Sequence, residues 1–155
     1  MFQFFVDPGQ IAGQEVMICG ADVNHIKNAL RMRPGERVRV SDQQGNDFLC
    51  EITQMEAQEV RLHILEACQG TELPVRVTLF QALPKSDKME WVIQKSIELG
   101  VHEIVPMATQ NCVVKLEARR AEAKRARWQA IAESAAKQSK RSMIPQVGAI
   151  RSFSE

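Results

Sequence analysis

Basic residues at helical spacing are the first candidates for chemistry in this chain. Lys88 and Lys95 lie seven positions apart with Trp91 between them, so all three would project from one side of a helix. Lys85 comes just before them, where a loop should follow a strand. Such cations suit a polyanion, and the alternative is an ordinary solvated helix face, which spacing alone favours.

A second basic cluster lies near the N-terminus, and only Glu36 opposes it. It consists of five residues within thirteen positions: Lys27, Arg31, Arg33, Arg37 and Arg39. The first three belong to a predicted helix end and the turn after it, from which they would reach RNA phosphates. The alternative is a solubilised outer face of a sheet, above all for the two arginines of the following strand.

The four cysteines are spread singly along the chain. Cys19, Cys50, Cys68 and Cys112 form no CxxC pair, which argues against a zinc site and against a disulfide-stapled secreted fold. We expect them to be small buried hydrophobic residues in a reducing compartment. A nucleophilic pair of Cys112 with His102 is a less favoured alternative.

The central stretch of the chain predicts a strand, a helix and a second strand. Residues 75–82 are rich in β-branched residues, with Val75 and Val77 at alternate positions, and 101–107 form another apolar run. Between them Asp87 predicts a helix N-cap with Glu90 as its partner, and Gly100 marks the helix end. We therefore predict a right-handed βαβ unit with ligands at the carboxyl ends of its parallel strands.

The N-terminal region predicts a small barrel over residues 1–70. Five strands are expected, at 2–6, 15–19, 36–42, 47–54 and 59–66. A helix is expected over 21–31 with Asp22 as its N-cap. Residues 67–74 contain Gly and Pro and should link this unit to a second one over 75–155.

A long basic helix is predicted over residues 116–138, followed by a strand over 147–150. Trp128, Ile131, Ala132 and Ala135 would form its apolar stripe. Residues 115–141 carry nine Lys and Arg against three Glu, although the whole chain has a net charge of only +1. The pattern favours a solvated face for one part of this charge: Arg119, Arg120, Lys124 and Arg125.

Composition limits the class of protein. The 155 residues are 45% hydrophobic and 25% charged, as in ordinary globular proteins, and allow two small units. The sequence has no apolar run of the roughly 18 residues that a membrane span needs, so no membrane partner is expected. We expect a cytoplasmic protein.

Three segments carry a resemblance to a known family. NHIKNALRMRPGERVRVSD (24–42), QALPKSDKMEWVIQKSIELGVHEIVPM (81–107) and RWQAIAESAAKQSKRSMIPQV (127–147) together resemble the RsmE family. Its members methylate N3 of one uridine in 16S ribosomal RNA. The architecture of its members resembles a PUA-like RNA-binding domain joined to a knotted SPOUT methyltransferase domain. Their chains continue beyond the position that matches residue 155.

The resemblance implies a fold and partners. The fold class would be α+β and α/β, with a small PUA-like β-barrel followed by the first part of a SPOUT-type domain with a parallel sheet. S-adenosyl-L-methionine would be the cofactor, 16S rRNA or the small ribosomal subunit the partner, and a homodimer the state of the complete protein. The knot that holds the cofactor in the family is formed by its last third, so these 155 residues alone are expected to be inactive.

The basic clusters and the resemblance together give the expected site residues. No catalytic, cofactor-binding or metal-binding residue is assigned. The expected RNA-binding residues are Lys27, Arg31, Arg33, Lys85, Lys88, Lys95 and Arg141. Lys85 or Arg141 would also suit stabilisation of a uracil anion.

Two other functions stay open at this point. One is a non-catalytic RNA-binding protein, for which salt-dependent RNA binding without cofactor uptake is expected. The other is a separate α/β enzyme that binds a small anion near Lys85 and Lys88, although the sequence has no Gly-rich phosphate loop.

Overall fold

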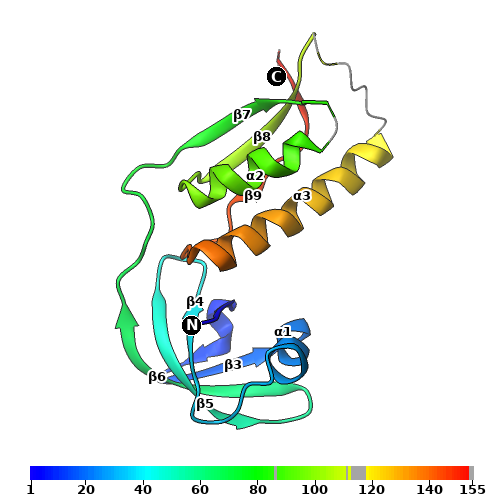
Figure 1. Cartoon of the computed structure of the whole chain (residues 1–155). Coiled ribbons are helices and arrows are strands. Elements are labelled where there is room, and N and C mark those ends of the chain that lie inside the picture. The colour runs from blue at the N-terminus through cyan, green and yellow to red at the C-terminus, as the bar shows by residue number, and fades with distance from the viewer. Residues whose placement is uncertain (86, 111, 113–117, 154–155) are drawn as a thin grey trace. The chain divides into compact units, whose positions relative to one another are not determined.

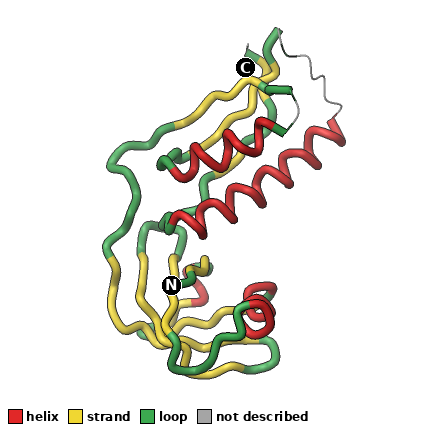
Figure 2. The backbone as a smooth tube through the Cα atoms, in the orientation of Figure 1, coloured by secondary structure: helices red, strands yellow, loops and turns green. Residues whose placement is uncertain are grey.

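The computed structural model describes residues 1–155 except 86, 111, 113–117 and 154–155. The chain divides into two compact units, Met1–Thr71 (unit 1) and Glu72–Glu155 (unit 2) (Figure 1). Unit 1 is built mainly of strands, whereas the two long helices belong to unit 2 (Figure 2). Each unit is described by itself.

Six strands of unit 1 form one curled mixed sheet in the order β1-β4-β5-β6-β3-β2. Their bounds are β1 (Gln3–Phe5), β2 (Ile11–Ala12), β3 (Glu15–Cys19), β4 (Arg37–Ser41), β5 (Asp47–Met55) and β6 (Glu59–Cys68). Only β1 and β4 pair in parallel. The five expected strands are present, and β3 has the expected bounds. The two-residue strand β2, after the short helix η1 (Pro8–Gln10), was not predicted because it is too short to show a period.

The core of unit 1 follows the alternation of apolar and polar residues along its strands. Val38 and Val40 of β4 are fully buried, while Arg37, the first residue of the strand, is exposed. Val60 and Leu62 of β6 are likewise fully buried, and they alternate with polar neighbours. Burial of one face fixes the strand register, since a slip of one residue would expose these valines.

The predicted helix over 21–31 is only partly correct. The chain forms an α-helix, α1 (Ala21–Asn24), that continues as a π-helical turn, η2 (His25–Ala29). The Leu30 amide donates to the His25 carbonyl at 2.9 Å, a five-residue step that a 3.6-residue pattern does not reveal. The N-cap is Gly20 with φ 76°, so the expectation for Asp22 was wrong by two positions.

Unit 2 is a parallel sheet with two helices. Its strands are β7 (Thr78–Ala82), β8 (Glu103–Ala108), β9 (Gln146–Val147) and β10 (Arg151–Ser152), and its helices are α2 (Lys88–Glu98) and α3 (Ala118–Ser139). β8 pairs with β7 on one edge and with β9 and β10 on the other, all in parallel. The predicted βαβ unit is therefore confirmed.

Both helices lie on one face of this sheet (Figure 1). Because β7, β8 and β9 follow one another across the sheet, two right-handed crossovers must place α2 and α3 on the same side, where they pack together. Met89, Ile93 and Ile97 of α2 recur at helical spacing and are buried, whereas Val92 beside them is half-buried. In α3 the buried stripe is Trp128, Ala132, Ala135 and Ala136, whereas Ile131 stays half-buried.

Three predicted boundaries in and near unit 2 were wrong, and a fourth is not tested. The first strand begins at Thr78, and Val75 and Val77 are 61% and 46% exposed, so their alternation reflects no buried strand. The strand expected over 147–150 is interrupted, because β9 ends at Val147 and β10 begins at Arg151. These two residues pair with Ile104 and Met107 of β8, so the chain between β9 and β10 has one residue more than the matching part of β8. β6 continues to Cys68, so the linker cannot begin at 67. The long helix is described from Ala118, and its expected start at 116 lies outside the described residues.

Candidate functional site

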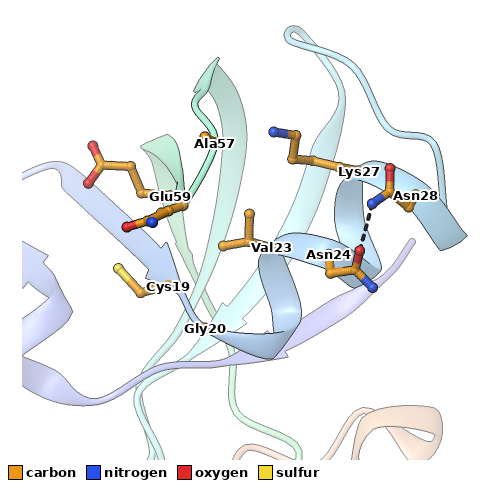
Figure 3. Close-up of a pocket in the computed structure, with 9 residues that line it drawn as sticks. Cys19, Gly20, Val23, Asn24, Lys27, Asn28, Ala57 and Glu59 are labelled. Carbon is orange, nitrogen blue, oxygen red and sulfur yellow. Dashed lines mark hydrogen bonds between the residues drawn. The ribbon is translucent and has the colours of Figure 1, made fainter.

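Lys27 of unit 1 lies beside a groove of about 560 Å³. The groove runs between the α1–η2 segment and the turn that joins β5 to β6, and Figure 3 shows Lys27 extending across it toward Ala57. The Lys27 ammonium donates to the Glu56 carbonyl at 2.8 Å. This bond fixes the ammonium at the rim without neutralising its charge, because a carbonyl is only a dipole.

Amide side chains of the same helical segment line this groove beside Lys27. Asn28 donates to the side-chain oxygen of Asn24 at 2.6 Å, which is possible because the two lie one turn apart. The π-helical turn orients the side chains on this side of the groove, because its wider turn rotates each later side chain about the helix axis. The other lining residues are Cys19, Gly20, Val23, Ala57, Gln58 and Glu59.

Arg31 and Arg33 are held outward by the buried Met32 between them. Met32 is 9% exposed, while both arginines are exposed and have no ion pair within the described part of unit 1. Arg31 has φ 53°, a left-handed conformation that ends the helical segment. The Arg33 amide donates to the Glu36 carboxylate at 2.7 Å, so the backbone of this turn is fixed while both guanidinium groups face solvent.

Arg39 of the same cluster has a structural role. Its guanidinium donates to Asp47 at 2.6 Å and to the Gln69 carbonyl at 3.0 Å. Asp47 is fully buried and also accepts from Ser41, which in turn accepts from Gln3 at 2.9 Å. A buried carboxylate needs such a partner, so this cation is not available to a ligand.

The candidate cations of unit 2 differ in their surroundings. Lys85 and Lys88 are exposed at the carboxyl end of β7 and the start of α2. Lys95 lies farther along the helix, is half-buried and pairs with Glu98 at 2.7 Å. Trp91, on the same face, is 64% exposed. The helical spacing thus predicted the shared face correctly, but the charge of Lys95 is compensated.

Arg141 is not at a surface. It is 4% exposed and donates to both carboxylate oxygens of Glu72 and to the carbonyls of Ile97 and Val101 at 2.9 Å. These carbonyls end α2 and begin the segment that leads to β8. The expectation that Arg141 contacts RNA or a uracil anion is therefore corrected, because its guanidinium is committed inside unit 2.

A second groove, of about 450 Å³, lies at the carboxyl ends of the parallel strands. Strand register places Ala82, Met107 and Arg151 side by side, and all three line it. They point to the face opposite Ile104 and Val147, which are buried, so this groove lies on the face away from α2 and α3. The remaining lining residues are Phe80, Thr109, Ser152 and Phe153.

The Cys112 thiol lies near this end of the sheet. It contacts the Thr109 hydroxyl at 3.2 Å and donates weakly to the Leu83 carbonyl at 3.5 Å. Hydrogen bonds from the Thr109 hydroxyl and amide lower the pKa of Cys112. His102 precedes β8 whereas Cys112 follows it, so the pair considered from the sequence lies at opposite ends of the strand.

The expectation that all cysteines are buried was also wrong. Cys50 is fully buried, Cys19 is exposed, and the other two are intermediate. Among the residues that the structure describes, no three His, Cys, Asp or Glu side chains are grouped to hold a metal ion. No helix in the described ranges is both long enough and apolar enough to cross a membrane.

Two family models match the two units of this fold. A family model described as an RNA methyltransferase domain matches residues 71–155, and one described as an RNA methyltransferase PUA domain matches 18–65. The chain belongs to this RNA methyltransferase family, which confirms the resemblance to RsmE and the expected fold class.

Individual relatives agree with this assignment. The chain is similar to the ribosomal RNA small subunit methyltransferase E of Bacillus subtilis, with 39% identity over 139 residues that cover 89% of this chain and 54% of the relative. The protein of that name from Mycobacterium tuberculosis is 30% identical, over 96% of this chain and 57% of its own length. The chain thus spans about half the length of these curated relatives.

A solved structure shows the same fold. It is the ribosomal RNA small subunit methyltransferase E of Neisseria gonorrhoeae, described as bound to S-adenosyl methionine. It is 34% identical to this chain with a TM-score of 0.84, over 99% of this chain and 63% of the solved chain.

Proposed function

We propose that this chain contributes to S-adenosyl-L-methionine-dependent methylation of N3 of a uridine in 16S ribosomal RNA. Family membership and a cofactor-bound structural neighbour support the reaction class. The names of the relatives support the ribosomal substrate and favour methylation over a non-catalytic RNA-binding role. For the complete protein we also propose a cytoplasmic location and a homodimer.

The reaction sets clear demands on the protein. It forms a bond from N3 of uracil to the methyl carbon, breaks the bond from sulfur to that carbon and releases the N3 proton. When bound, the cofactor supplies this methyl group as an electrophile on a sulfonium. Positioning of the base and stabilisation of its developing negative charge should dominate, and the target base must be unpaired or flipped out.

Several described residues fit these demands in part. The groove at the strand ends has the apolar surface of Phe80, Met107 and Phe153 with polar groups at Thr109 and Arg151, which suits one side of an adenosyl group. Lys85, exposed at the same end of the sheet, suits an anionic uracil better than Arg141 does, because Arg141 is buried. No described residue is assigned as the base that accepts the N3 proton.

RNA binding is proposed for residues of both units. In unit 1 the cations are Lys27, Arg31 and Arg33, and in unit 2 they are Lys85, Lys88 and, with its charge shared by Glu98, Lys95. The observation that carries this proposal is the pair of exposed arginines, Arg31 and Arg33, on either side of a buried anchor. Exposed cations without acidic partners release counterions from RNA and add to its affinity.

Salt dependence of RNA binding tests this role. Arg31→Ala with Arg33→Ala should weaken binding of a fluorescent oligouridylate and reduce the slope of log affinity against log salt by about 1.4, or about 0.7 per lost contact. Arg31→Lys with Arg33→Lys keeps both charges and should retain most of the slope. An unchanged slope in the alanine variant would show that this turn is only a solvated face.

The chemical step has its own readout. With the complete protein, methyl label from the cofactor should appear at N3 of a uridine when small-subunit RNA is digested and its nucleosides are separated, whereas residues 1–155 alone should give none. Label at uracil C5 or at a ribose hydroxyl would contradict the proposed reaction.

A further inference from the structure

The N-terminal half of α3 is an exposed basic surface that no assignment above uses. Residues 118–127 carry five cations against one acidic residue, Glu122. The cations are Arg119, Arg120, Lys124, Arg125 and Arg127. The sequence pattern alone favours a solvated face here, but the structure adds three observations.

The first observation is that described acidic residues neutralise two of these cations. Arg125 donates to Glu122 at 2.6 Å, and Arg127 pairs with Glu90 of α2 at 2.8 Å. Arg119, Arg120 and Lys124 are exposed and have no ion pair within the described residues of unit 2. Arg120 and Lys124 lie at i and i+4, so they share one ridge of the helix.

The second observation is that this placement opposes helix stability. The first described turn of α3 contains two arginines and no acidic residue. Arg120 and Lys124 also repel each other across one turn. Charges that break local rules without a compensating contact indicate a binding role, because packing gives no reason for them.

The third observation is the position of this ridge within unit 2. Helices α2 and α3 both connect parallel strands, so they run in the same direction, and the Glu90–Arg127 ion pair lies in the first turn of α2. The residues of α3 before Arg127 therefore extend past the start of α2, as Figure 1 shows. They lie toward the carboxyl ends of the strands, the same end of the sheet as Lys85 and Lys88.

We propose that Arg120 and Lys124, with Arg119 beside them, form a phosphate-binding ridge that contacts the RNA sugar–phosphate backbone next to the strand ends. This inference rests on the proposed function, because it takes RNA to be the partner. A run of unpaired cations on one helix carries no base-reading geometry, so the ridge should contribute affinity and salt dependence rather than sequence preference.

A charge-matched pair of variants tests the ridge. Arg120→Gln with Lys124→Gln removes two ridge charges and keeps good helix formers. Arg76→Gln with Lys137→Gln removes two positive charges elsewhere in unit 2 and is the control for net charge. Affinity for the fluorescent oligouridylate is measured between about 50 and 200 mM salt, and the ridge variant should lose about 1.4 from the slope while the control loses less than half of that.

A second measurement separates binding from folding. Thermal unfolding followed by circular dichroism should show an unchanged or raised midpoint for the ridge variant, since the charges it removes oppose the helix. A lower midpoint with a loss of helical signal would overturn the inference, because the charges would then serve the structure.

The remaining outcomes distinguish failure of the ridge inference from failure of the proposed function. If the ridge variant keeps the wild-type slope while Arg31→Ala with Arg33→Ala reduces it, the ridge inference fails and the proposed function stands. Equal losses in the ridge variant and its control also overturn the inference, since net charge alone then matters. If the wild-type chain binds anionic lipid vesicles but not the oligouridylate, the ridge inference and the proposed RNA role both fail.

Discussion

Arg141 and Glu72 form an ion pair that joins the first residues of unit 2 to the end of α3. The Arg141 Nε donates to Glu72 at 2.9 Å, the Ser142 amide donates to the same carboxylate at 2.8 Å, and Arg141 Nη1 caps the carbonyls of Ile97 and Val101. One guanidinium thus connects three segments that are distant in sequence. This arrangement gives Arg141 a structural role that its place in a family motif does not indicate.

Arg141→Ala should therefore destabilise unit 2. The change leaves two buried carbonyls without their donor and the Glu72 carboxylate without its guanidinium, although the Ser142 amide still donates to it. We expect a loss of about 2–4 kcal/mol, at or below the range for a fully buried pair because Glu72 keeps some contact with water. Urea unfolding measures this loss. Arg76→Ala, at an exposed arginine of the same unit, is the control and should change stability by less than about 0.5 kcal/mol. A small loss for Arg141→Ala would return it to the RNA-binding candidates.

Ile93→Ala tests the buried face of α2. Ile93 is fully buried, so emptying its site should cost about 2–5 kcal/mol. Leu99→Ala removes a side chain that is 81% exposed at the end of the same helix and should have little effect. A loss under about 0.5 kcal/mol for Ile93→Ala would contradict the assignment of this face.

The parts of the fold that the sequence predicted are those with a repeated local signal. Val38 and Val40, or Met89, Ile93 and Ile97, recur at the period of their element, so burial of one face determines their position. The βαβ unit followed because each of its elements is long enough to show such a period. The pair Lys88 and Trp91 was placed on one exposed face for the same reason.

The parts that were missed depend on partners far away in the chain. Nothing near Arg141 indicates that Glu72, 69 positions earlier, takes its charge. In the same way, Asp47 converts Arg39 from a surface cation into part of a buried network. The π-helical turn at His25 and the break between β9 and β10 each insert one residue, and a change that small leaves no trace in a hydrophobic pattern.

Asp42 should make unit 1 sensitive to acid. Burial disfavours its charged form, but hydrogen bonds from the Asn46 side chain and from the amides of Gln44 and Asn46 outweigh this effect and lower the pKa of Asp42 below its ordinary 3.8. A carboxyl whose pKa is lower in the folded state stabilises that state above its unfolded pKa. This contribution is lost as the pH falls below 3.8 through the lowered value.

Asp42→Asn measures the contribution of this carboxylate. Near neutral pH the variant should be less stable by about 1–3 kcal/mol, because the turn loses a charged acceptor of three hydrogen bonds. The difference between the two proteins in urea unfolding should narrow as the pH falls below 3.8. A difference that stays constant from neutral pH to the most acid condition would show that the Asp42 carboxylate does not titrate as argued.

The cysteines should differ strongly in their reaction with iodoacetamide. Burial raises the pKa of Cys50 from 9.0 to about 12, with a smaller contribution from Cys68, so at a given pH its thiolate fraction falls about a thousandfold. Cys19 is exposed, and the lowered pKa of Cys112 increases its thiolate fraction. In the native protein, peptide mass spectrometry should therefore find label at Cys19 and Cys112 long before Cys50. In urea, where burial is removed, all four should react at similar rates, and labelling of native Cys50 as fast as Cys19 would mean that the core of unit 1 opens on the time scale of the reaction.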